Sequence, residues 1–144
     1  MKHSLPLRAL SRLLQYPDRE LMDHLSEVAA ALYEMPKLSK KVQVGLEEFV
    51  NNLEVSDLMD SQENYVECFD RGRATSLHLF EHVHGDSRER GQAMVDLLQT
   101  YKEGGLQLSA NELPDHLSII LEFASTLPLD QAKQFVGEMA HILN

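Results

Sequence analysis

The sequence predicts an all-α protein, a helical bundle built as one domain. Apolar side chains recur every three to four residues along almost the whole chain, the spacing that places them on one face of an α-helix. No run of alternating apolar and polar residues lies between hairpin turns, as it would in a β-sheet protein. The chain has 144 residues, a length that suits one domain. A chain of about 150 residues buries roughly 68–70% of its unfolded surface, so its core needs neither a metal nor a disulfide.

Proline residues and helix-capping side chains divide the first third of the chain into three helices. The first helix should end before Pro17, because the residue that precedes a proline is pushed out of the α region. Asp18 fits the N-cap of a second helix, which Pro36 stops, and a third helix should follow Ser39. The side chains expected to face inward are Leu7, Leu10, Leu13, Leu14, Leu21, Leu25, Val28, Ala29, Leu32, Val42, Leu46, Phe49, Val50 and Leu53.

A fourth helix leads into a charged segment in the middle of the chain. It should begin near Ser56 or Ser61 and end at Gly72, because glycine readily adopts the backbone conformation that terminates a helix. One or two helical turns through Phe80 should follow, before a break at Gly85. The apolar face of the fourth helix should consist of Tyr65, Val66 and Phe69.

Three more helices are expected between this break and the end of the chain. The pair Gly104-Gly105 should close the first of them. Ser109 and Glu112 are spaced as a capping box for the next, and Pro114 fits the first turn of that helix equally well. Asp130 opens the last. The inward side chains should be Met94, Leu97, Leu98, Tyr101, Leu117, Ile120, Leu121, Ala124, Ala132, Phe135, Val136, Met139, Ile142 and Leu143.

The charge and the single cysteine exclude several classes of protein. The formal net charge of -10 would repel a phosphate backbone, so we expect no nucleic-acid partner and instead expect a basic peptide or protein segment. Cys68 is alone, so no intramolecular disulfide and no multi-cysteine metal site can form. The chain has no signal-peptide run and no apolar stretch long enough to span a bilayer. These features predict a cytoplasmic protein that meets membranes only peripherally or through a partner.

Residues 69–94 concentrate charge unusually, with four of the seven arginines and three of the seven histidines of the chain. Within this segment His78, Glu81 and His82 match the H-x-x-E-H pattern of one class of zinc peptidase. On a helix the two histidines would share a face and could bind one zinc ion, with Glu81 as general base. This pattern would indicate a small zinc-dependent hydrolase, which also needs a third protein ligand and a substrate cleft.

The same cluster also has plain structural interpretations. The histidines can be partly buried polar groups that flank Leu79 and Phe80. The arginines can form exposed ion pairs with neighbouring acids, each worth only about 0–1 kcal/mol. Asp115 can be a first-turn acid that the helix dipole favours. A generic acidic scaffold that binds any basic amphipathic peptide is therefore a further alternative.

Four segments of the sequence together resemble the NarJ family, the assembly chaperones of respiratory nitrate reductase. They are residues 14–18 (LQYPD), 65–73 (YVECFDRGR), 76–94 (SLHLFEHVHGDSRERGQAM) and 112–117 (ELPDHL). The Pro-Asp-His element in the last of them also resembles the wider TorD/DmsD group of redox enzyme maturation proteins. The resemblance runs from the first predicted helix to about residue 127.

The resemblance implies an all-helical cytoplasmic chaperone of the TorD/NarJ type, with no enzymatic activity and no cofactor of its own. Such a chaperone binds the N-terminal leader of the apo nitrate reductase α subunit, which is the catalytic subunit. It supports insertion of the molybdenum cofactor and maturation before membrane docking, and it is not part of the finished enzyme. An acidic helical domain with an apolar groove suits a basic amphipathic peptide bound as a helix.

We expect the leader-binding site to be built from residues of the quoted motifs. The groove walls would be Tyr65, Phe69, Phe80 and Leu117. The acceptors for basic leader side chains would be Asp70, Glu81 and Asp115. The side chains that organise the site would be Arg71, Arg73, His82 and His116.

Three further expectations concern the end of the chain and the cysteine. Family members usually continue well beyond the position of Asn144, which predicts that a C-terminal tail is missing from a domain spanning residues 1–144. The apolar Ile142-Leu143 end would allow self-association by dimerisation or domain swapping. Cys68 stands where an apolar residue is common in the family, so we expect it in the core.

Overall fold

The computed structural model describes residues 5–32, 39–71, 76–82, 88–109 and 112–143. Its elements are α1 (Leu5–Leu13), α2 (Arg19–Asp23), α3 (Leu25–Leu32), α4 (Lys40–Val55), α5 (Leu58–Tyr65), the π-helix η1 (Val66–Asp70), the 3-10 helix η3 (Leu79–His82), α6 (Arg88–Glu103), α7 (Leu117–Ser125) and α8 (Leu129–Leu143). No strand occurs in these ranges, and the all-α prediction is confirmed. No helix in the described part of the chain is long and apolar enough to cross a membrane.

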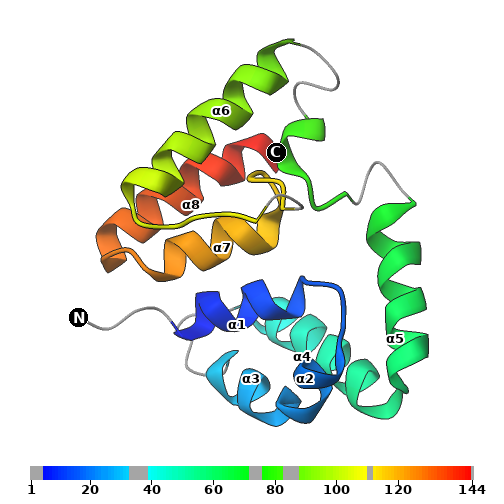
Figure 1. Ribbon diagram of the computed structural model, residues 1–144. Helices are drawn as coiled ribbons and strands as arrows, with labels where there is room; N and C mark the ends of the chain where they lie inside the picture. The colour runs from blue at the N-terminus through cyan, green and yellow to red at the C-terminus, as the bar shows by residue number, and fades with distance from the viewer. Residues whose placement is uncertain (1–4, 33–38, 72–75, 83–87, 110–111, 144) are drawn as a thin grey trace.

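The helices pack around two clusters of buried apolar side chains. The first cluster lies among α1, α2, α3 and α4, and the second among η3, α6, α7 and α8. In Figure 1 the helices of the first cluster lie below those of the second, and α5 runs along the edge of the molecule between the two groups. The most deeply buried large apolar side chains are Leu21 in the first cluster and Leu79, Tyr101 and Ile120 in the second.

The contact between α1 and α7 joins the two groups of helices (Figure 1). Ser11 on α1 donates a hydrogen bond from Oγ to the carbonyl oxygen of Ser118 on α7. Both serines are buried, with 2% and 4% of their surface exposed. The small side chain of Ser11 lets the backbones of α1 and α7 approach each other. Its hydrogen bond offsets the free-energy cost of burying the Ser11 hydroxyl group.

Two helix starts in the first half follow the prediction. Asp18 accepts a hydrogen bond from the Leu21 N–H at 2.8 Å, and Ser39 accepts one from the Val42 N–H at 3.3 Å. The segment that Asp18 opens is broken once, at His24, into α2 and α3. The His24 N–H is shared between two carbonyl groups of the preceding turn, an arrangement common at helix ends.

The fourth helix, α5, begins near Ser56 as predicted, but the residue that caps it is Asp57. Asp57, rather than Ser56 or Ser61, caps α5, and it accepts a hydrogen bond from the Asp60 N–H at 2.8 Å. Ser56 instead ends α4, and Ser61 is buried inside α5. A carboxylate is at least as good an N-cap as a serine hydroxyl, so the register of the chain between α4 and α5 decides which is used.

The predicted start of the helix after Ser109, which is α7 in the structure, is wrong. The Ser109 N–H does donate to Glu112 Oε1 at 2.8 Å, as in a capping box. The pair closes a turn, because α7 begins only at Leu117, with His116 as its N-cap. Pro114 therefore precedes the helix instead of occupying its first turn.

Glycines close α6 as predicted. Gly105 has a φ of +89°, in the left-handed region that favours glycine. Gly104 lies so close to α7 that a Cβ there would be 2.5 Å from a ring carbon of Phe123.

The inward face of α6 is narrower than predicted, because Leu97 and Tyr101 are buried while Leu98 is 43% exposed. Val42 on α4, also predicted to face inward, is 47% exposed.

Candidate functional site

The candidate site is centred on a short bridge between two segments that are far apart in the sequence. His78 and His116 pair as an isolated antiparallel β-bridge. The Leu79 N–H donates to the Asp115 carbonyl oxygen at 3.1 Å, and the Leu117 N–H donates to the Leu77 carbonyl oxygen at 2.8 Å. This bridge places the start of η3 against the start of α7.

Asp115 is buried at the centre of the bridge, with 0% of its surface exposed. Its Oδ2 accepts a hydrogen bond from the Phe80 N–H at 3.0 Å, and its Oδ1 lies 3.5 Å from Nδ1 of His78. Next to it, the hydroxyl of Tyr101 donates to the Pro114 carbonyl oxygen at 2.7 Å. Burial, together with the charge of Asp115, raises the pKa of Tyr101. In this conformation the Asp115 carboxylate therefore binds groups of its own chain.

His116 connects this bridge to α7 and to α5. Its Nδ1 accepts hydrogen bonds from the N–H and the hydroxyl of Ser118, at 3.2 and 2.8 Å. The ring proton then lies on Nε2, which is 3.4 Å from the Tyr65 hydroxyl oxygen. Burial, and next the charge of His78, lower the pKa of His116 below its usual 6.5. The neutral ring is the form that caps α7.

Tyr65 brings both groups of helices together. Its hydroxyl donates to the Leu14 carbonyl oxygen at 2.7 Å, beside the contact with His116. Burial, with the charge of Asp70, raises the pKa of Tyr65 to about 12, so the hydroxyl stays protonated as a donor. Its ring packs edge-on against Tyr16 and Phe69, with centroids 5.6 and 5.0 Å away. Tyr16, at one end of this row, is 51% exposed.

A cavity of about 270 Å³ lies beside this aromatic row, between α1, α4 and the segment formed by α5 and η1. Its lining is mostly apolar and consists of Leu13, Pro17, Phe49, Asn52, Leu53, Ser61, Asn64, Tyr65, Cys68 and Phe69. The prediction that Cys68 belongs to the core is wrong, because the residue is exposed. Its place in the π-helical turn, which widens the helix by one residue per turn, puts it at this cavity.

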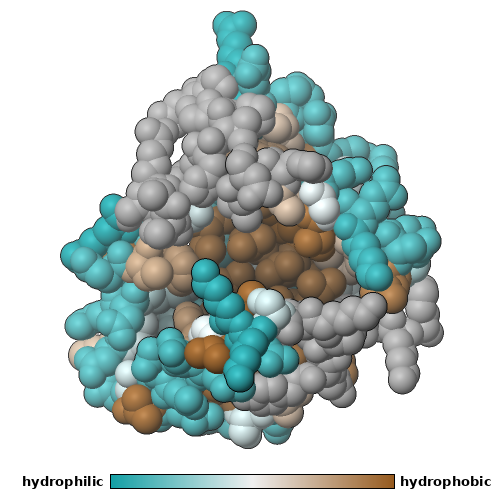
Figure 2. All heavy atoms as spheres, turned by 180° about the vertical axis from the view of Figure 1, so that it is seen from behind, coloured by the Kyte–Doolittle hydropathy of each residue, from teal (hydrophilic) through white to brown (hydrophobic). Residues whose placement is uncertain are grey.

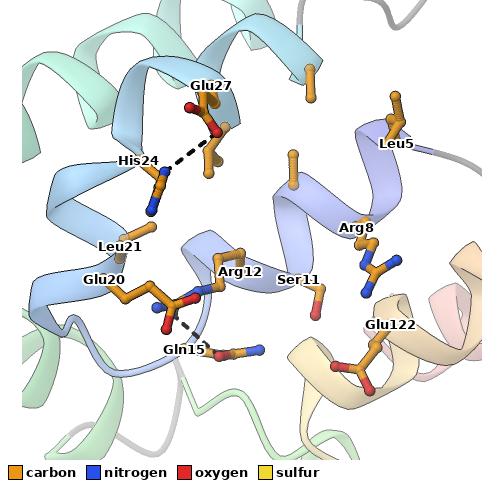
Figure 3. A pocket seen from close by; sticks show the side chains of 13 residues that line it. Leu5, Arg8, Ser11, Arg12, Gln15, Glu20, Leu21, His24, Glu27 and Glu122 are labelled. Atoms are coloured by element: carbon orange, nitrogen blue, oxygen red, sulfur yellow. Dashed lines mark hydrogen bonds and ion pairs between the residues drawn. The ribbon is translucent and has the colours of Figure 1, made fainter.

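A second pocket, of about 450 Å³, lies between α1, α2, α3 and α7. Figure 3 shows Arg8 and Arg12 projecting from α1 toward the acids Glu20 and Glu122 on the neighbouring helices. His24 Nδ1 lies 3.4 Å from Glu27 Oε2 at its edge. None of the side chains that line this pocket was predicted from the sequence to belong to a site. The only signal for it was the spacing of Arg8 and Arg12, which places them on one face of a helix.

The predicted site residues do not form one continuous wall. Tyr65 and Phe69 line the 270 Å³ cavity, whereas Phe80 and Leu117 belong to the second apolar cluster. Asp70 is exposed at the end of η1.

The predicted organising residues are only partly visible. Arg71 pairs through Nη1 with Glu67 Oε2 at 2.9 Å. Arg73 and the side chains of Glu81 and His82 lie outside the described residues. Their predicted roles stay predictions.

The premise of the zinc interpretation is wrong. His78 is not helical: it precedes η3 and pairs with His116 in the β-bridge, with its ring edge-on to that of His116 at 5.0 Å. The shared helix on which the zinc interpretation placed His78 and His82 is therefore absent. The described residues contain no group of three side chains that could hold a metal ion.

Figure 2 views the molecule from behind and shows apolar side chains in a recess framed by hydrophilic ones. The two pockets and this recess give the chain concave surfaces of the kind that receive a ligand.

A family model described as nitrate reductase delta subunit matches residues 34–143. The chain belongs to this family. The resemblance to NarJ proteins noted in the sequence is thereby confirmed.

Two proteins of Escherichia coli are similar to this chain over most of its length. The nitrate reductase molybdenum cofactor assembly chaperone NarJ of Escherichia coli K12 is 50% identical over 134 residues, or 93% of this chain and 57% of NarJ. NarW of the same organism, for which that role is inferred, is 48% identical over 95% of this chain and 56% of NarW. The chain thus spans little more than half the length of these relatives.

A solved structure supports the fold of the family. The crystal structure of a candidate redox enzyme maturation protein from Archaeoglobus fulgidus superposes with a TM-score of 0.63 and 24% identity. It covers 99% of this chain and 84% of the other. At that identity the match supports the helical architecture alone.

Proposed function

We propose that this chain is an assembly chaperone for a molybdenum-containing nitrate reductase and has no catalytic activity. The observation that carries the proposal is the 50% identity over 93% of the chain to a protein named as such a chaperone. The client would be the apo form of the catalytic α subunit. The chaperone would act in the cytoplasm, before the α subunit docks on the membrane, and would leave once the molybdenum cofactor is inserted.

We further propose that the N-terminal leader of the α subunit binds as a helix beside the row formed by Tyr16, Tyr65 and Phe69. Tyr16 and Phe69 offer aromatic surface next to an apolar cavity. Asp70 is exposed at the end of the same segment and could receive a basic side chain. The net charge of -10 favours a basic peptide over the whole surface.

In this proposal Asp115 and His116 act indirectly. Asp115 is fully buried and holds η3, while His116 caps α7 and meets Tyr65. Both would keep Tyr65 in place, and neither would touch the peptide in the conformation described. Phe80 and Leu117 would likewise support the site from the second apolar cluster.

Calorimetric titration with the leader peptide of the cognate α subunit tests the proposal. The control is a scrambled peptide of identical composition and charge. Saturable binding of the native order alone is expected. Equal binding of both peptides, lost at moderate salt, would identify a generic acidic scaffold instead. Absence of binding to either would refute leader recognition by these 144 residues.

A further inference from the structure

A buried hydroxyl group in the cavity between α1, α4 and α5 has no hydrogen-bond partner among the described residues. Ser61 lines this cavity and is 3% exposed, and its Oγ makes no hydrogen bond among the described residues. The buried serines Ser11, Ser118 and Ser125 all use their hydroxyl groups in hydrogen bonds. A buried hydroxyl without a partner is costly and uncommon, so an additional partner is expected at Ser61.

The remainder of the lining favours a flat apolar group. Phe49, Tyr65 and Phe69 supply aromatic rings, and Leu13 and Leu53 supply aliphatic surface. Aromatic rings pack well edge-on or offset against one another, as Tyr65 and Phe69 already do. A ligand group that packs against these apolar walls and also hydrogen-bonds to the Ser61 hydroxyl has an aromatic ring with a polar group at its far end. A phenol ring has this chemistry, because its hydroxyl can donate and accept a hydrogen bond.

The surface next to the cavity carries negative charge. Five exposed acids recur every three to four residues along α5 and η1, so they share one side of this segment, and they are Asp57, Asp60, Glu63, Glu67 and Asp70. Glu67 is paired with Arg71, which leaves a net negative stripe beside the cavity-lining side of the same segment. The charge of this stripe complements a basic helix.

We propose that the cavity is a tyrosine-specific subsite, which receives the phenol side chain of a basic helical peptide, with Ser61 as hydrogen-bond partner of the phenol hydroxyl. Ser61 is then a specificity-determining residue. The preference for a phenol group is inferred from the lining of the cavity alone. The assignment of the phenol to a leader peptide rests on the proposed function.

Side-chain analogues test the subsite without any peptide. p-Cresol has the side chain of tyrosine and toluene that of phenylalanine, and each is titrated into isotope-labelled protein while amide NMR shifts are followed. Shifts are expected at the cavity residues Asn52, Asn64 and Cys68. The change Ser61→Ala should reduce the affinity for p-cresol about fivefold, the effect of one ordinary hydrogen bond, and should leave toluene binding equal or tighter.

The deciding quantity is the change in the ratio of the two affinities between the wild type and Ser61→Ala, because the difference in hydrophobicity between the analogues is the same for both proteins and cancels. An unchanged ratio in Ser61→Ala would overturn the role of Ser61, and shifts confined to other surfaces would overturn the subsite. Ser56→Ala, which changes a serine outside the cavity, is the matched control and should leave the ratio unchanged.

A competition experiment then tests the peptide half of the proposal. The leader peptide should displace p-cresol from the wild-type protein. Leader binding by calorimetry without displacement would overturn the assignment of this cavity to the leader, while leaving the proposed function intact. Displacement would support both.

Discussion

At the residue scale, the polar atoms of the Pro114-Asp115-His116 element hold the fold together. Asp115 accepts from the Phe80 N–H, and His116 accepts from the Ser118 N–H. The Pro114 carbonyl accepts from Tyr101. The sequence suggested a first-turn acid favoured by the helix dipole, but Asp115 lies outside α7 and serves a different segment. Asp115 is therefore a buried structural acceptor, and its hydrogen bond holds Phe80 of the second cluster in place.

We therefore expect Asp115→Ala to destabilise the protein strongly. The change leaves the buried Phe80 N–H without its acceptor, which costs about 1–3 kcal/mol in the free energy of unfolding. Asp115→Asn retains an acceptor oxygen of the same shape and should cost less. Urea denaturation of the three proteins measures the difference. Equal losses for the two variants would contradict the role of the hydrogen bond.

His116 should make stability depend on pH. Its pKa is lowered in the folded state, so the unfolded chain takes up a proton at a higher pH than the folded one. The contribution of the neutral ring is complete above its usual pKa of 6.5 and is lost as the pH falls below that value. Unfolding free energies from about pH 7.5 to about pH 5.5 should therefore decline.

The variant His116→Asn isolates this effect, because asparagine is also a good N-cap but does not titrate in this range. Its unfolding free energy should decline less over the same interval than that of the wild type. Parallel curves for the two proteins would assign the pH dependence to other groups.

At the element scale, side-chain acceptors decide where helices begin. Asp18, Ser39, Asp57 and His116 each accept a backbone N–H at a helix start. Those N–H groups have no partner within the helix, so one acceptor there fixes the boundary. Serine and aspartate were both available before α5, and the sequence alone could not rank Ser56 and Ser61 against Asp57.

Substitution of the cap of α5 tests this assignment. Asp57→Ala removes the acceptor of the Asp60 N–H and should lower the free energy of unfolding by about 1 kcal/mol. Ser56→Ala, one residue earlier, should change it by no more than about 0.5 kcal/mol, because no described hydrogen bond uses its side chain. Thermal and urea unfolding compare the two. A larger loss for Ser56→Ala would contradict the assignment of Asp57 as the cap of α5.

At the scale of the whole molecule, two apolar clusters meet along the extensive contact between α1 and α7. The seam between α1 and α7 and the Tyr65 hydroxyl join them. Tyr65 reaches Leu14 at the end of α1 and His116 at the start of α7, so a movement of one group relative to the other must alter the aromatic row. The proposed peptide site therefore depends on how the two groups are held.

Enlarging Ser11 should separate the two groups. Ser11→Leu adds volume to a tightly packed seam and should cost about 1–3 kcal/mol, whereas Ser11→Ala loses only the hydrogen bond, about 1 kcal/mol. Amide hydrogen exchange should then show that α3 and α7 open independently in Ser11→Leu but together in the wild type. Uniform exchange in both proteins would show that the seam does not control their coupling.

Much of the fold was accessible from the sequence because local rules govern it. The helical spacing, the caps Asp18 and Ser39 and the glycines that close α6 were all predicted and are present. The candidate site was only partly accessible. Tyr65 and Phe69 line a cavity, whereas Phe80 and Leu117 lie in another cluster. Apolar spacing shows that a face is buried without showing which element it meets.

The sequence by itself determined the all-α class, the acidic surface and, through four recognisable segments, the family. These properties depend on spacing, composition and local motifs, which are carried by short stretches of chain. Only the tertiary structure decided that His78 pairs with His116, that Asp115 is buried, and that the Ser61 hydroxyl finds no partner within the described part of the chain. These features arise from residues tens of positions apart, and their energies depend on burial and on the partner that each polar atom meets.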